Sequence, residues 1–373
     1  MYRLIRYIRT NRIKSIVFII LLAVYYFSLP KNLFSDPTAT VITCNNDELL
    51  GAIIADDGQW RFPEAEHIPE KFKTCILTFE DEYFYKHPGF NPISIFKALK
   101  ENISSGSVKR GGSTITQQVI RLSRKGKART YTEKFKELIL ATRLELRLSK
   151  DEILKLYTSH APFGGNVVGL DAAAWRYFNR SASDLSWAES ATLAVLPNAP
   201  SLIYPGKNQK RLLDKRNRLL LYDNGIIDEL TYGLSLAEGL PQKPYPLPQI
   251  APHLLQKIAK SNKGKRIKTT IKTDLQEQAN RIVAQHYNQL KQNEIYNLSV
   301  LVLDVNTREV LTYIGNSPTD KAHQKSVDII DKPRSTGSIL KPFLYAAMLD
   351  SGDLLSHTLV PDVHTQFGSY QPE

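Results

Sequence analysis

Cysteine is scarce in this sequence, and its two cysteines narrow the classes of site. Cys44 and Cys75 belong to no CxxC or Cys/His pattern, so nothing predicts a zinc site. Outside the cytosol, a single disulfide and two unpaired thiols are both open interpretations, and the sequence gives the disulfide no preference. The sequence also lacks internal repeats, which excludes a repeat architecture.

Acidic residues are scarce relative to basic ones. The sequence has 37 Asp and Glu against 49 Lys and Arg, which gives a formal net charge of +12. This imbalance predicts an anionic partner: nucleic acid, an acidic membrane surface or a phosphorylated substrate. Hydrophobic residues make up 42% of the 373 residues, which excludes extensive disorder and allows two domains.

The N-terminus lacks an apolar run of full membrane-spanning length. Five basic residues precede the apolar stretch 16–29, which is shorter than the ~20 residues of a typical span. A cleavable signal peptide is the alternative, but no small-x-small cleavage site follows. We therefore expect residues 1–35 to form a cytoplasmic tail and an uncleaved transmembrane helix. The rest of the chain then lies outside the cytoplasm, which argues against nucleic acid as a partner.

The pattern of secondary structure divides the chain. Residues 68–200 are mainly helical, with capping boxes predicted at Thr130, Ser149 and Ser186. Five prolines between residues 240 and 252 indicate a linker. From about residue 266, strand and helix patterns alternate, which predicts a second, α/β domain.

Two segments of the helical region suggest catalysis on an anionic substrate. In the first, Glu80 begins a run of three adjacent carboxylates. Their mutual repulsion raises the pKa of at least one of them, and a carboxylate with a raised pKa suits a general base. A solvated acidic turn is the alternative. In the second, residues 109–118 place two glycines before Ser/Thr caps and a helix, which exposes N–H groups to an anion. No acidic residue occurs between Lys109 and Arg129, so we interpret this segment as a pyrophosphate cradle; a capped helix with a solvated basic face is the alternative.

A third segment, residues 129–133, ends in Glu133. This carboxylate either completes a capping box with Thr130 or serves the basic stretch by coordinating a metal or orienting a sugar.

In order along the chain, five segments resemble the signatures of the peptidoglycan glycosyltransferases (glycosyltransferase family 51), the first half of class A penicillin-binding proteins. They are residues 80–89, 111–118, 129–133, 153–178 and 189–200. The sequence departs from the family at Ser159, where Asn is usual, and at Thr130, where Lys is usual. Residues 161–165 are similar to the corresponding segment of the type 1C subgroup of penicillin-binding proteins.

The resemblance implies a fold and a location. The fold is a mainly α, lysozyme-like glycosyltransferase domain at residues 36–225 after one transmembrane helix. A linker at 226–265 and the truncated start of an α/β transpeptidase domain at 266–373 follow. The location is the inner (cytoplasmic) membrane, with a single pass, a cytoplasmic N-terminus and a periplasmic or extracytoplasmic catalytic domain. Residues 90–99 are expected to lie against the membrane, and an amphipathic helix packed into the core is the alternative.

The resemblance also implies an activity: lipid II is polymerised into β-1,4-linked glycan strands, and undecaprenyl pyrophosphate is released. Glu80 is the implied base, which deprotonates the acceptor 4-hydroxyl. Glu133 is the implied second glutamate, which acts at the donor pyrophosphate through Mg²⁺, another divalent cation or basic side chains. The implied substrate-binding residues are Lys109, Arg110, Ser113, Thr114, Gln117, Gln118, Arg121 and Arg129. The implied partners are lipid II, the growing glycan strand, the membrane and other cell-wall synthesis proteins, but no nucleic acid.

Ser338 and Lys341 fit the SxxK pattern of transpeptidases, in which the serine is the acylated nucleophile. No Ser-x-Asn or Lys-Thr-Gly sequence follows Ser338. We therefore expect a truncated, inactive transpeptidase half. A non-catalytic membrane scaffold is the remaining alternative class, although a scaffold does not need five catalytic signatures.

Overall fold

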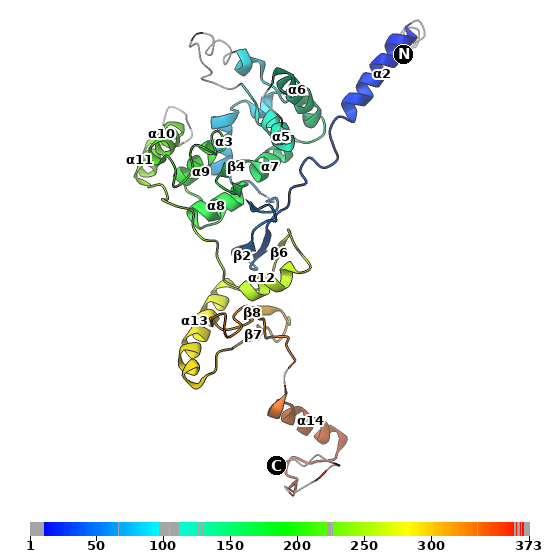
Figure 1. The fold of residues 1–373 in the computed structure, drawn as a ribbon, viewed down its shortest axis with the longest axis vertical. Helices are drawn as coiled ribbons and strands as arrows, with labels where there is room; N and C mark the ends of the chain where they lie inside the picture. Colours follow the sequence, from blue (N-terminus) through cyan, green and yellow to red (C-terminus); the bar gives the residue numbers. More distant parts are fainter. Residues whose placement is uncertain are drawn as a thin grey trace.

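The protein is described by a computed structural model, in which a larger helical unit and a smaller α/β unit follow one another along the long axis (Figure 1). The described residues are 11–65, 67–96, 104, 112–125, 127, 130–221, 225, 227–333, 335–361, 363, 366 and 368.

The helices of the larger unit begin where the sequence provides caps. At α7 and α9, Ser149 and Ser186 form full capping boxes with the glutamates three residues later, as predicted. At α6, Thr130 caps the helix, but no reciprocal bond from the Glu133 side chain is present. The bounds are α3 Glu70–Glu80, α5 Ile115–Ser123, α6 Tyr131–Glu145, α7 Lys150–His160, α8 Leu170–Phe178, α9 Trp187–Val195, α10 Gln209–Leu219 and α11 Glu229–Ala237.

Helix α9 lies at the centre of the larger core. Every residue from Ser190 to Val195 is buried, and α9 packs against α3 and α10. Next to them, α5 packs against α6 and α7. Each fully buried large side chain, such as Phe72 and Ile120, contributes roughly 1.5–3 kcal/mol. This core fixes the C-terminal end of α3 against the face of α5.

Three small sheets are present in the described parts of the chain. Strands β3 (Trp60–Arg61), β5 (Val167–Val168) and β4 (Pro162–Gly164) form one, with β3 parallel and β4 antiparallel to β5. In the second, β1 pairs antiparallel with β2 and parallel with β6. In the third, β7 and β8 form an antiparallel hairpin. The bounds of the last two sheets are β1 Thr40–Thr43, β2 Leu49–Ile53, β6 Arg266–Lys268, β7 Val300–Leu303 and β8 Val310–Ile314.

The smaller unit shares a sheet and a core with the N-terminal segment. Val41 of β1 lies beside Arg266 of β6, and Ile42 and Leu50 are buried with Leu255 and Tyr313. Two helices, α11 and α12 (Pro252–Ala259), lie within residues 226–265, for which the sequence predicts a linker. Helix α13 (Thr273–Leu290) packs against β8, in agreement with the alternating strand and helix patterns predicted from about residue 266.

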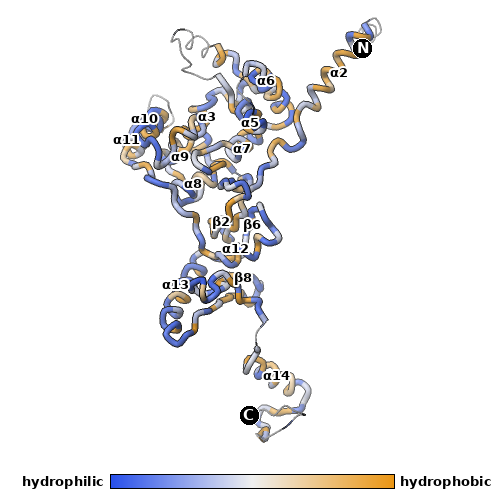
Figure 2. Tube along the Cα trace, viewed as in Figure 1, coloured by the Kyte–Doolittle hydropathy of each residue, from blue (hydrophilic) through white to orange (hydrophobic). Residues whose placement is uncertain are grey.

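Helix α2 (Arg12–Tyr26) projects away from the larger unit (Figure 1). It is apolar along most of its length (Figure 2), and none of its residues is buried. Its C-terminal end is tied to α6, because the Tyr25 hydroxyl lies 3.0 Å from Thr142 Oγ1 and Arg143 Nε donates to the Tyr26 carbonyl. A membrane-spanning helix was predicted here, but none of the helices in the described parts of the chain has the length and apolar character needed to cross a membrane.

The two cysteines are both free and buried, so the reading of two separate thiols is correct. Burial raises the pKa of the Cys75 thiol to about 12. At the far end of the chain, Ser338 lies in a 3-10 turn, η5 (Gly337–Leu340), and Lys341 begins α14 (Lys341–Ser351). Both residues are exposed, and no residue of α14 is buried. Shorter 3-10 turns are η1 Phe84–Lys86, η2 Ala182–Asp184 and η4 Lys291–Asn293.

Candidate active site

Glu80 is the last residue of α3, and its side chain points to α5. Gln118 Nε2 donates to Glu80 Oε2 at 2.7 Å, while Glu80 Oε1 is buried without a protein partner among the described residues. The residue as a whole is half-buried. Burial raises the pKa of the Glu80 carboxyl, and the bond from Gln118 opposes this. A carboxylate with a raised pKa suits proton abstraction.

Two buried polar residues of the motif, Asp81 and His87, connect this loop to α5. His87 Nε2 lies 3.0 Å from both Asp81 oxygens, and the Ile115 N–H donates to Asp81 Oδ2 at 3.0 Å. The Gly89 N–H donates to His87 Nδ1, so the His87 proton is on Nε2 and faces Asp81. These bonds hold the start of α5 next to Glu80. Asp81 and His87 therefore position α5 relative to Glu80.

One face of α5 meets three carboxylates in turn. Residues three apart share a helix face, and Gln118, Arg121 and Arg124 follow this spacing. Gln118 binds Glu80, while Arg121 holds Glu137 of α6 through two bonds of 3.1 Å. Arg124 then pairs with Glu133, as described next. Helix α5 therefore connects the two glutamates that the sequence singles out.

Glu133 lies among cations. Arg124 Nη2 lies 2.9 Å from Glu133 Oε2, and Lys136 Nζ lies 3.3 Å from Oε1. The bond from Arg124, followed by that from Lys136, lowers the pKa of the Glu133 carboxyl. Of the two bonds of a capping box, only the one from the Glu133 backbone N–H to the Thr130 side chain is present. The Glu133 carboxylate does not bond to the Thr130 backbone.

The other predicted contact residues around α5 differ in their surroundings. Thr114 caps α5 and donates to the Gly89 carbonyl at 2.7 Å, so its hydroxyl is committed to the fold. Ser113 Oγ accepts from Arg121 and from Lys134, a cation that sequence reasoning missed. Gln117 is fully buried, and its Nε2 has no protein partner among the described residues. Three predicted residues, Lys109, Arg110 and Arg129, lie outside the described residues.

Two further residues approach Glu80 from distant parts of the sequence. Lys215 of α10 donates to Asn198 Oδ1 at 2.8 Å, and its charge opposes the rise in the Glu80 pKa. Burial lowers the pKa of Lys215 itself. Tyr157 of α7 is buried beside the site, with its hydroxyl unpartnered by the described residues. Sequence reasoning placed Tyr157 in a family signature but gave it no chemical role, and no local pattern indicates Lys215.

The residues around Glu133 do not fit a metal. Both Glu133 oxygens already bind cationic side chains, and the neighbouring Glu137 is held by Arg121. A divalent cation prefers several oxygen ligands in place of positive neighbours. No group of three or more His, Cys, Asp or Glu suited to a metal occurs in the described parts of the chain. We therefore derive no step through a metal.

Gly89 offers a test of how tightly the motif loop packs on α6. Its φ is +92°, and an added Cβ would lie 2.9 Å from the backbone of Ala141. We expect Gly89→Ala to destabilise the protein by about 1–3 kcal/mol, seen as a lower Tm, because both strain and overlap arise. The matched control is Gly58→Ala, which has φ +73° but no atom near the added Cβ. Equal Tm losses in the two variants would contradict the packing explanation.

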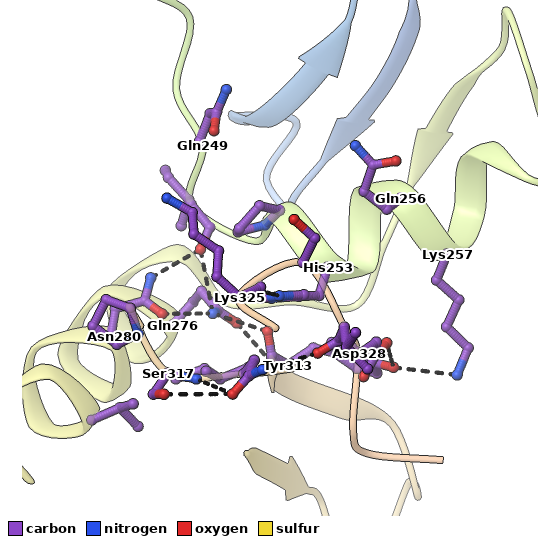
Figure 3. Close-up of a pocket in the computed structure, with 18 of the residues that line it drawn as sticks. Gln249, His253, Gln256, Lys257, Gln276, Asn280, Tyr313, Ser317, Lys325 and Asp328 are labelled. Carbon is purple, nitrogen blue, oxygen red and sulfur yellow. Dashed lines mark hydrogen bonds between the residues drawn. The ribbon is translucent and has the colours of Figure 1, made fainter. Parts of the chain in front are cut away.

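A cavity of about 940 Å³ lies in the smaller unit, and neither Glu80 nor Glu133 lines it. Figure 3 shows side chains from α12, α13, β8 and the loop after β8 converging on it. Its polar groups bind one another: Lys257 Nζ lies 3.0 Å from Asp331, and the Tyr313 hydroxyl donates to Asp328 at 2.6 Å. These bonds hold the loop to α12 and β8, which is a structural role.

Comparison with known proteins indicates the family of the larger unit. Residues 46–223 match the family model described as Transglycosylase, so this part of the chain is a transglycosylase domain, an enzyme domain of glycosyl transfer. Penicillin-binding protein 1C of Escherichia coli (strain K12) is 34% identical over 338 residues, covering 90% of this chain and 44% of that protein. Penicillin-binding protein 1A of Neisseria lactamica is 34% identical over 245 residues, 61% of this chain and 31% of that protein. The chain thus spans less than half the length of these relatives.

Among solved structures, penicillin-binding protein 1A from Haemophilus influenzae matches 73% of this chain and 32% of that chain at 19% identity. The TM-score is 0.32, which is too low to bear on the arrangement of the two units.

Proposed function

We propose that the helical domain polymerises lipid II into β-1,4-linked glycan strands and releases undecaprenyl pyrophosphate. The observation that supports this most is the buried Glu80 carboxylate, held by Gln118 at one end of a helix face whose other end carries Arg121 and Arg124. This face offers a base for the acceptor sugar and cations for a diphosphate leaving group.

In the proposed reaction, Glu80 takes the proton from the 4-hydroxyl of the acceptor GlcNAc. That oxygen forms a bond to C1 of the donor MurNAc while the bond from C1 to the lipid pyrophosphate breaks. The electron pair leaves with the pyrophosphate, whose growing charge needs nearby cations. Glu80 then returns its proton to solvent.

Cationic side chains near Glu133 form the proposed pyrophosphate site. Arg124 and Lys136 lie on either side of its carboxylate, and Lys134 approaches Ser113 at the start of α5. Because ion pairs fix the direction of long side chains, Glu133 orients these cations. The residues Lys109, Arg110 and Arg129 stay predicted members of this site.

The direct test is polymerisation of lipid II by the purified chain in detergent, with glycan strands separated on a gel. The proposal is supported if glycan strands form from lipid II with the folded chain as the sole protein present. A chain that is folded by circular dichroism, binds lipid II and forms no strands would favour a non-catalytic scaffold.

Membrane attachment is part of the proposal, because the substrate is a lipid. On one side of α6, Tyr131, Phe135 and Ile139 are exposed, and so is Leu146, the residue directly after the helix. The short helical segment before residue 97 adds Phe96, which is 76% exposed. Apolar side chains of this size exposed on a helix favour an interfacial position in a bilayer.

We expect Phe96→Ser and Phe135→Ser each to weaken binding to phosphatidylglycerol–phosphatidylethanolamine vesicles by at least ~10-fold, because each removes a large apolar side chain. Vesicle flotation of a chain beginning at Ser28 measures this without α2. Leu234→Ser is the matched control, since Leu234 is 63% exposed on α11. An equal loss in the Leu234 variant would show that exposed apolar area alone drives binding and would remove α6 and Phe96 from the proposed surface.

A further inference from the structure

Several buried polar atoms around the site, Gln117 Nε2 among them, lack protein partners among the described residues, and two of them concern the base itself. One is Oε1 of Glu80, and the other is the hydroxyl of Tyr157 on α7. Tyr157 is 1% exposed, so its hydroxyl does not reach bulk solvent. Since buried polar groups are nearly always hydrogen-bonded, two such atoms in one place indicate a role beyond packing.

The two groups act on each other electrostatically. The pKa of the Tyr157 hydroxyl is raised well above its usual range, first by burial and then by the negative charge of Glu80. Helix α5 brings the two groups to the same region, because it packs against α7, which carries Tyr157, and sends Gln118 to Oε2 of Glu80. Gln118 thus donates to Oε2, while the neutral Tyr157 hydroxyl lies close enough to the carboxylate to be affected by its charge.

We propose that Tyr157 is a positioning residue whose hydroxyl donates a hydrogen bond to Glu80 Oε1, directly when substrate binds or through one water molecule. Gln118 holds Oε2 in the same way. An ionised carboxylate accepts up to about four hydrogen bonds, so it can still take the proton of the acceptor hydroxyl. This inference rests on the proposed function, in which Glu80 is the base.

The other groups that act on Glu80 are charged. Arg121 of α5 and Lys215 of α10 favour its ionised form, whereas the adjacent Asp81 opposes it. Helix α9, which packs on α3, has Glu189 as its one charged residue, and that carboxylate binds the start of its own helix. Loss of the Tyr157 hydroxyl changes none of these charges. It removes a donor to the ionised form, which raises the pKa of Glu80 further.

The test is Tyr157→Phe in the full chain, with initial rates of lipid II polymerisation measured across pH. We expect kcat/KM to fall by at least ~10-fold and its acid limb to move to higher pH. The Tm should not fall, because the hydroxyl makes no bond to the described protein. A wild-type rate and acid limb, or a rate loss that only parallels a lower Tm, would overturn the proposal.

Tyr177→Phe is the matched control. Tyr177 of α8 is equally buried, but its hydroxyl donates to the carbonyls of Phe163 and Gly164 at 3.1 and 3.0 Å. We expect this variant to have a lower Tm and an unmoved acid limb. If its acid limb moves as far as that of Tyr157→Phe, the shift is not specific and the proposal fails.

Glu80→Gln separates this inference from the proposed function. If that variant is inactive and Tyr157→Phe keeps the wild-type pH profile, only the positioning role fails. If Glu80→Gln polymerises lipid II at the normal rate, the base itself is wrong, and the inference fails with it.

Discussion

Glu80→Gln is expected to lower the rate of lipid II polymerisation by roughly 10²–10⁴-fold, the usual contribution of a general base. The amide has the same shape and can still accept the bond from Gln118, so substrate binding should survive. The Tm should not fall, because burial already disfavours the charge of this carboxylate. The polymerisation rate is measured from the glycan strands separated on a gel over time. The affinity for the substrate is measured by binding of labelled lipid II.

The control is Glu82→Gln, which changes an exposed carboxylate two residues away. It should leave the rate within about two-fold of wild type, since surface substitutions of this kind have small effects. Near-normal turnover by the Glu80 variant would remove this residue from the mechanism.

The pH profile follows from the same carboxylate. Because burial raises the pKa of Glu80, the ionised base becomes available only above the usual carboxylate range. Activity should therefore rise with pH through this raised pKa and be lost below it. An acid limb in the ordinary range of a solvent-exposed glutamate would contradict the burial of the base in the working enzyme.

Glu133→Gln is expected to reduce turnover by about 10²-fold, the scale of losing one electrostatic element of a site. The amide binds Arg124 and Lys136 less firmly, so these cations lose their fixed direction toward the leaving group. Donor binding should be unchanged or tighter, because a negative charge has been removed. A KM-against-kcat comparison on lipid II measures the two effects separately.

Helix capping does not explain such a loss. The bond from the Glu133 backbone N–H to Thr130 remains in the variant. Glu152→Gln is the control for capping. In α7, the Glu152 side chain accepts a bond from the Ser149 backbone N–H and so takes part in a full capping box, which the Glu133 side chain does not. A fully active and stable Glu133 variant would reduce its contacts to an ordinary surface ion pair.

The sequence predicts this fold best where the determining signal is local. Ser149 and Ser186 cap their helices as expected, because the donor and acceptor are three residues apart. Helix α6 was also predicted, but its apolar spacing does not say which side is buried. Phe135 and Ile139 face outward, while Glu137 and Arg143 are buried.

For the site, the sequence identifies the residues but not their contacts. It proposed Glu80 and Gln118 separately, and the bond between them depends on how α3 meets α5. It gave Thr114 a substrate role, whereas its hydroxyl serves the cap and Gly89. Lys134 and Lys215 carry no local signal, since each becomes important only through the packing of a distant helix.

The sheet formed by β1, β2 and β6 has a consequence for the order of folding. Val41 and Arg266 are neighbours in this sheet although the whole helical domain lies between them in the chain. During synthesis, one edge of β1 therefore stays unpaired until β6 has left the ribosome. Pairing between segments so far apart in the sequence is also slow. An exposed strand edge invites pairing with other chains. The nascent protein therefore carries an open strand edge for as long as residues 266–268 are not yet made, and a chain cut off before them keeps that edge.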